Sequence, residues 1–266
     1  MRMFCLSLIF LMSFPFYATA AGKTHTNSLG MEFVRIPAGS FSLGEGGPFG
    51  EGFKTTISKA FYMGKYEVTQ QQWMDVMGEN PSAFKGRTNP VEKVSWDDVQ
   101  EFIRRLNEKE GHTFYRLPTE AEWEHAARAG TKTESFFTKD VYASNNSNYL
   151  AIGRQLANYA WFGDYEYADN GRRHKVEGTA EGTTHPVGQL EPNPWGLYDI
   201  YGNVWEWVQD WYGKFPEQDT VDYRGPASGS IRVLRGGSWD NDAGYCRAAY
   251  RNDDSADYRN YDLAVR

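Results

Sequence analysis

Cys246 sets the first limit on the chemistry of this chain. The sequence contains two cysteines, Cys5 and Cys246, and Cys5 lies in an N-terminal apolar stretch that is expected to be removed. A thiolate is a nucleophile and a soft metal ligand, so Cys246 could bind a metal together with histidine or carboxylate partners. A single cysteine can also be a small buried apolar residue. An intramolecular disulfide is excluded in a mature chain without Cys5.

The segment 238–262 carries a dense set of side chains suited to binding. Tyrosine supplies rigid contact area, and asparagine, aspartate and serine supply adaptable hydrogen bonds, as in antibody loops. The composition predicts a surface that binds a protein or peptide, and its candidate residues are Trp239, Asp240, Asn241, Asp242, Tyr245, Tyr250 and Tyr258.

The N-terminus is typical of an export signal. Arg2 precedes an apolar run from Phe4 to Tyr17, and Ala18-Thr19-Ala20 is a small-x-small cleavage site. We expect residues 1–20 to be a signal peptide, 21–29 a linker and 30–266 a single domain. The protein is thus predicted to be exported, either periplasmic or secreted.

The remaining composition narrows the class of partner. No later segment is long and apolar enough to cross a bilayer, so no membrane span is expected in the mature chain. The formal charge is −7, and no basic stripe is present, so nucleic acid is not an expected partner.

Helices are predicted at three segments that begin with an N-cap residue. Thr69, Ser95 and Thr119 are the caps, and Glu122 stands at the capping-box position after Thr119. Apolar residues recur at helical spacing after each cap. These stripes are expected to form core rather than a site.

Strands are short and separated by long irregular segments. Apolar alternation and β-branched or aromatic runs predict strands at 33–37, 41–43, 61–68, 205–207 and 231–235. The stretch 134–191 is polar and weakly periodic. A loop region of this length in a compact domain is usually functional or held by bound ions.

Seven blocks, taken together and in order, resemble the formylglycine-generating enzyme or sulfatase-modifying factor domain. They are GMEFVRIPAGSFSLG (30–44), KYEVTQQQWMDVMG (65–78), NPVEKVSWDDVQEFIRRLNEKEG (89–111), YRLPTEAEWEHAARAGT (115–131), ANYAWFG (157–163), THPVGQLEPNPWGLYDIYGNVWEWVQDWYG (184–213) and RVLRGGSWDNDAGYCRAAYRN (232–252). The resemblance implies an α+β, C-type-lectin-like fold that is loop-rich and poor in regular secondary structure.

The resemblance also implies calcium as a cofactor. The matching blocks place candidate calcium ligands at Asn158, at the carbonyl of Tyr159, and at Asn203 and Glu206. Carboxylate, amide and backbone oxygens are the ligands that Ca²⁺ takes. Other interpretations stay open, because Asn203 could be a turn residue and Glu206 a solvated strand residue.

The catalytic metal of the family is not expected here. Active members resembling this chain hold Cu(I) between two cysteines that follow Gly-Gly-Ser and oxidise a peptide thiol to an aldehyde. Here Ser238 and Cys246 match, but Asn241 stands at the first cysteine position. An amide is a poor Cu(I) ligand beside a thiolate. We therefore expect no copper and no formylglycine-generating activity by the usual route, although the family is one of oxidoreductases.

Two functions remain as alternatives to a merely divergent family member. One is a lectin-fold binding protein with a variable Asn/Asp/Tyr-rich C-terminal surface. The other is a tailoring oxidase that works without the copper pair. For any catalysis by this chain, the candidate residues are Cys246 and Ser238.

Overall fold

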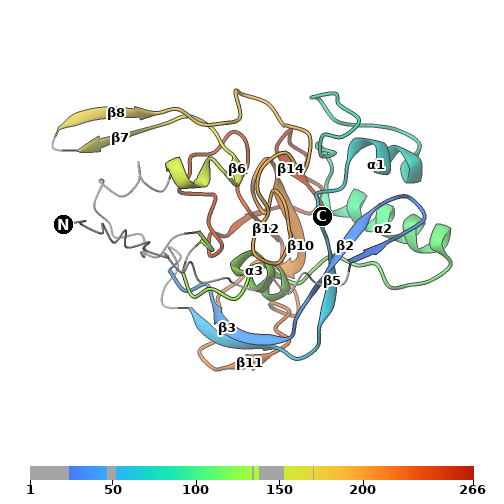
Figure 1. The fold of residues 1–266 in the computed structure, drawn as a ribbon. Coiled ribbons are helices and arrows are strands. Elements are labelled where there is room, and N and C mark those ends of the chain that lie inside the picture. The colour runs from blue at the N-terminus through green and yellow to red at the C-terminus, as the bar shows by residue number, and fades with distance from the viewer. Residues whose placement is uncertain (1–23, 47–51, 134, 138–152, 170) are drawn as a thin grey trace, which may run out of the picture.

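The fold is an assembly of small sheets and helices joined by long loops (Figure 1). The computed structural model describes residues 24–46, 52–133, 135–137, 153–169 and 171–266. The helices discussed below are α1 (Gln70–Met77), α2 (Trp96–Glu110) and α3 (Glu120–Arg128). The predicted signal peptide, 1–20, lies outside the described residues.

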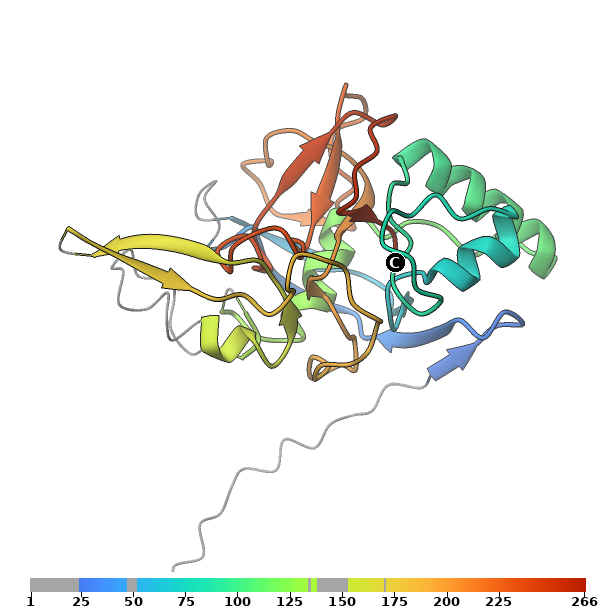
Figure 2. The ribbon, with the colours of Figure 1, turned by 90° about the horizontal axis from the view of Figure 1, so that it is seen from above.

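The strands form five small sheets among the described residues. The first sheet has the strand order β1 (Thr24–Thr26), β2 (Glu32–Ile36), β5 (Phe61–Gly64), and the second has the order β13 (Asn252–Asp254), β12 (Arg232–Arg235), β10 (Trp205–Trp211), β14 (Leu263–Ala264). The third has the order β11 (Thr220–Val221), β4 (Phe53–Ile57), β3 (Gly39–Leu43). Two sheets are strand pairs: β6 (Ala160–Trp161) with β9 (Tyr201–Gly202), and β7 (Tyr165–Asp169) with β8 (Arg172–Val176). In both views the β7–β8 hairpin extends away from the body on the side opposite α1 and α2 (Figures 1 and 2).

The helix predictions are confirmed down to their caps. Thr69, Ser95 and Thr119 each accept a hydrogen bond from the backbone N–H three residues later, and each helix has a reciprocal capping box. These bonds satisfy backbone donors that the first turn of a helix leaves unpaired. No helix in the described part of the chain is long and apolar enough to span a bilayer.

The strand predictions hold for location but not for pairing. The strands predicted at 33–37 and 41–43 are β2 and β3, which lie in different sheets. The strand predicted at 61–68 ends at Gly64. Part of the expected linker is strand β1, which pairs with β2. The irregular stretch 134–191 contains the β7–β8 hairpin and the short strand β6. Other pairings, such as β2 with β5 and β4 with β11, join strands that are distant in the sequence, so local sequence pattern does not specify them.

Helix α3 lies at the centre of the molecule and packs against β3, β4, β10 and β12. Trp123 on this helix is fully buried, and its indole N–H donates to Glu206 of β10 at 2.7 Å. Trp207 is also fully buried and donates to the carbonyl of Val94 at 3.0 Å. Large rings therefore fill the core while their polar atoms keep partners.

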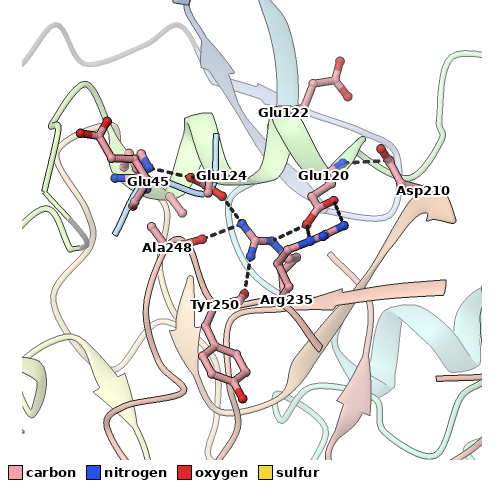
Figure 3. A network of polar contacts seen from close by, with 12 residues as sticks. Glu45, Glu120, Glu122, Glu124, Asp210, Arg235, Ala248 and Tyr250 are labelled. Atoms are coloured by element: carbon pink, nitrogen blue, oxygen red, sulfur yellow. Dashed lines mark hydrogen bonds and ion pairs between the residues drawn. The ribbon is translucent and has the colours of Figure 1, made fainter. Parts of the chain in front are cut away.

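The same helix carries two buried carboxylates that bind arginines from the C-terminal third of the chain (Figure 3). Glu120 makes a paired contact with Arg251, with N–O distances of 2.6 and 2.8 Å. Glu124 binds Arg235 of β12 and, at 2.8 Å, Arg128. Arg235 also donates to the carbonyls of Ala248 and Tyr250. The network thus ties α3 to β12 and to the segment 248–251.

Glu124→Gln is predicted to lower the free energy of unfolding by about 3–5 kcal/mol, because it removes the anion that two buried guanidinium groups need. Urea unfolding followed by circular dichroism measures the change. The matched control is Glu101→Gln, at an exposed residue of α2 that pairs with Arg104 and Arg105. Exposed pairs contribute little, so the control should unfold like the unmodified protein. Equal losses in the two variants would contradict a dominant role for the buried network.

Candidate functional site

The turn after β12 carries the Gly-Gly-Ser motif. Gly236 and Gly237 have φ angles of +104° and +80°, which side chains with a Cβ rarely adopt. A Cβ on Gly237 would lie 2.7 Å from the sulfur of Cys246. Glycine at this position therefore lets the turn pack directly on the cysteine.

Cys246 is a core residue in this structure. Its side chain has no exposed surface and belongs to the same apolar cluster as Trp123 and Val233. Burial, with a smaller contribution from Asp242, raises the pKa of the Cys246 thiol far above its ordinary value. A protonated, enclosed thiol is a poor nucleophile and a poor metal ligand.

Asn241, at the position of the missing cysteine, is part of the turn itself. Its amide oxygen accepts a hydrogen bond from the Ser238 hydroxyl at 2.7 Å, and its backbone N–H donates to the Ser238 carbonyl at 3.1 Å. Its carbonyl accepts from the Gly163 N–H at 2.8 Å. Cys246 is the free cysteine among the described residues. The residues present do not fit a copper ion held by two thiolates.

Two of the predicted calcium ligands, Asn203 and Glu206, are buried with protein partners. The Asn203 amide oxygen accepts from the His185 N–H at 3.0 Å, and its NH₂ donates to Glu67 at 2.7 Å. Glu206 accepts from Trp123 and from Arg266, the latter at 2.8 Å. Protein groups therefore supply hydrogen-bond partners to both side chains. Because Glu206 is buried, the alternative of a solvated Glu206 is wrong. Calcium binding here stays a prediction.

The other two predicted calcium ligands, Asn158 and Tyr159, lie just before β6. The Asn158 side chain is exposed, and its carbonyl accepts from the Glu191 N–H at 2.9 Å. The Tyr159 ring stacks on Phe137 with a centroid distance of 5.1 Å. No group of three or more His, Cys, Asp or Glu side chains is placed to hold a metal in the described residues. A calcium site built on amide and carbonyl oxygens does not require one, so this prediction also stands untested.

Three of the predicted ligand-binding residues, Trp239, Tyr245 and Tyr250, take part in two groups of packed aromatic rings. Tyr245 and Tyr250 pack with a centroid distance of 4.8 Å. Trp239 packs on Tyr261 at 5.5 Å and edge-on against Phe84 at 5.2 Å. Trp239 is mostly buried and supports this surface rather than covering it. The remaining predicted residues are Asp240 and Tyr258, which are exposed, and Asn241 and Asp242, which are half-buried.

Three residues of this region were missed by the sequence prediction of ligand-binding residues. Phe84 lies in an irregular loop that is distant from segment 238–262 in the sequence, and no local sequence pattern predicts its place beside Trp239. Tyr261 and Asp262 lie within the Tyr- and Asp-rich segment, where composition alone does not single them out. Asp262 is buried beneath the surface, and its backbone carbonyl accepts from the Trp205 N–H at 2.7 Å.

Comparison with known proteins establishes the family. A model of the sulfatase-modifying factor enzyme 1-like domain matches residues 18–266. A formylglycine-generating enzyme of Streptomyces coelicolor is 34% identical over 207 residues, which cover 73% of this chain and 59% of that enzyme. The chain belongs to the sulfatase-modifying factor family. It spans about three fifths of that enzyme's length.

Two further proteins are similar along most of the chain. A protein named chaperone protein LppX, from Paenibacillus barcinonensis, is 32% identical over 270 residues and 87% of either chain. The solved structure of Treponema denticola variable protein 1 is 32% identical, with a TM-score of 0.75 over 91% of this chain and 96% of that one. The predicted α+β, loop-rich fold of this family is confirmed.

Asp262→Asn is predicted to flatten the pH dependence of stability between about pH 4 and 6. Burial raises the pKa of Asp262 to about 6, against about 3.9 in an unfolded chain. The folded state holds this proton more tightly, so the contribution to stability is complete below about pH 4. It is lost as the pH rises through 6.

Urea unfolding of the two proteins across pH 4–7 measures this difference. Asp219→Asn, at an exposed aspartate, is the matched control and should keep the unmodified pH profile. Superimposable profiles for Asp262→Asn and the unmodified protein would show that Asp262 does not titrate as described.

Proposed function

We propose that this protein is an exported, ligand-binding member of the sulfatase-modifying factor family that does not generate formylglycine. The proposal rests mainly on the hydrogen bonding of Asn241 and the burial of Cys246. Asn241 uses its amide oxygen to close a turn with Ser238, and Cys246 is enclosed in the core. A site that must bind Cu(I) and reach a peptide thiol needs two available sulfur donors.

The C-terminal surface supports the binding role. We define it by the candidate residues of segment 238–262 together with Phe84 and Tyr261. Tyr245, Tyr258 and Tyr261 expose much of their rings there, and Asp240 is exposed among them. Rigid aromatic rings beside polar side chains favour contact with a protein or peptide.

The likeness to Treponema denticola variable protein 1 supports the same interpretation. A variable protein needs a frame that holds its fold while surface residues change. In this chain the Glu–Arg network and the capped helices supply such a frame. Segment 238–262 adds exposed side chains, among them Asp240, Tyr245 and Tyr258, that take no part in this network. We therefore propose that this segment determines the ligand.

The unmodified protein is predicted to retain no stoichiometric copper when it is loaded with Cu(I) under reducing, anaerobic conditions. It should also oxidise a cysteine-containing peptide no faster than buffer does. Copper is measured by mass spectrometry of the desalted protein, and aldehyde by peptide mass. Cys246→Ser should behave identically. Asn241→Cys supplies the second sulfur but leaves Cys246 enclosed. Copper binding by this variant would show that the absent donor, rather than the burial of Cys246, prevents the unmodified protein from binding copper. One copper per unmodified chain, or catalytic aldehyde formation, would contradict the proposal.

The surface rings and the supporting ring are predicted to differ in their effect on stability. Tyr258 is 42% exposed, so Tyr258→Ser should change the free energy of unfolding by less than about 0.5 kcal/mol. Trp239 packs between Phe84 and Tyr261, so Trp239→Ala should cost about 3–5 kcal/mol. Urea unfolding of both variants tests this. Comparable losses would mean that the surface cannot vary independently of its frame.

A further inference from the structure

A second concave site lies apart from the C-terminal surface. It is a groove of about 810 Å³ between the sheet β1–β2–β5 and the chain that follows α2. This volume falls within the range of roughly 300–1,000 Å³ that is typical of ligand sites. None of the residues that define the C-terminal surface lines it. We call it the aromatic groove.

The walls of the aromatic groove are ring faces from separate segments. Phe33 stacks on Tyr115 with a centroid distance of 5.5 Å, and His112 stacks on Phe114 at 4.6 Å. Tyr62 completes the wall on the side of β5. Phe114 is 81% exposed and Tyr62 50% exposed. Such exposure of large rings on one concave face has a hydration cost, which is typical of a binding site.

The charges around the groove favour a cation. Arg116 is neutralised by a two-bonded contact with Glu122, at 2.7 Å for each bond. Arg266, which also lines the groove, pairs with Glu206. Glu110 accepts a hydrogen bond from a neutral group, the Ser28 hydroxyl. Among the lining charges, its carboxylate is therefore the one without a cationic partner in these contacts.

The position of Glu110 strengthens this preference. It is the last residue of α2, and the carboxyl end of a helix carries the negative pole of the helix dipole. The faces of aromatic rings also carry negative charge and attract guanidinium and ammonium groups. The ring faces, the end of α2 and the Glu110 carboxylate therefore all attract a cation to the groove.

The groove also offers donors for a peptide backbone. A guanidinium has five N–H donors. Arg116 uses three of them, two on Glu122 and one on the carbonyl of Leu117 at 3.0 Å. The remaining donors suit peptide carbonyl oxygens. The volume also exceeds what one alkyl cation needs, so a peptide fits better than a free amine or guanidine.

We propose that the aromatic groove binds an extended peptide segment through an arginine or lysine side chain, which stacks on Phe114 and Tyr62 and pairs with Glu110. This site is independent of the proposed function of the C-terminal surface, because it uses different residues. The carbonyl oxygens of the peptide pair with Arg116.

The test is an NMR titration of the isotope-labelled mature protein with acetyl-Gly-Gly-Arg-Gly-Gly-amide at roughly 50 mM salt. Saturable binding is expected, with shifts at residues that line the groove. Replacing arginine by citrulline, which keeps the shape and removes the charge, should weaken binding at least about tenfold. Free acetyl-arginine-amide should bind more weakly than the peptide.

Protein variants locate the effect. Phe114→Ala and Glu110→Gln should each weaken peptide binding roughly fivefold without lowering the unfolding temperature. Phe114 is exposed, and Glu110 is only half-buried, where glutamine can still accept the hydrogen bond from Ser28. Glu217→Gln, at an exposed acid outside the groove, is the charge-matched control and should leave binding unchanged. Equal binding of the citrulline peptide, equal binding of the free amino-acid amide, equal effects of Glu217→Gln and Glu110→Gln, or no binding at all would each overturn the proposal.

Discussion

Ion pairs between the buried carboxylates of α3 and arginines from the C-terminal third of the chain hold the centre of the molecule together. Glu120 and Glu124 lie in the middle of the molecule without exposed surface and bind Arg251 and Arg235 from the far end of the chain. A fold with little regular secondary structure has few backbone hydrogen bonds between strands to hold distant segments together. Here charge pairs that cannot be left unmatched in the core hold α3 against β12 and segment 248–251.

The same packing determines what chemistry the Gly-Gly-Ser turn can perform. Once Arg235 holds the end of β12, the chain turns through Gly236 and Gly237 directly onto Cys246. The thiol is then enclosed, and Asn241 closes the turn instead of facing a metal. Burial that stabilises the frame thus removes the sulfur from reaction, and we place the function on surfaces built around the frame. Those surfaces expose rings and carboxylates that the core does not use.

Local signals in the sequence predicted a substantial part of this fold, and long-range features escaped it. The caps at Ser95 and Thr119 predicted α2 and α3 because a helix start is a local hydrogen-bonding problem. The β12 strand was also predicted from local sequence, by the alternation and β-branched residues of 231–235. The burial of Glu206 was not, because it depends on Arg266 and Trp123 from elsewhere in the chain. Aromatic-groove residues, too, come together only through tertiary packing.

The most direct test of the account is the reactivity of the Cys246 thiol in the native protein. Alkylation by iodoacetamide, followed by mass spectrometry of the peptide that contains Cys246, gives its rate with and without urea. A core thiol reacts only when the protein opens, so we expect negligible labelling in buffer and complete labelling in the unfolded chain. Rapid, stoichiometric labelling of the folded protein would contradict a structural role for this cysteine and would show that its thiol is accessible for reaction.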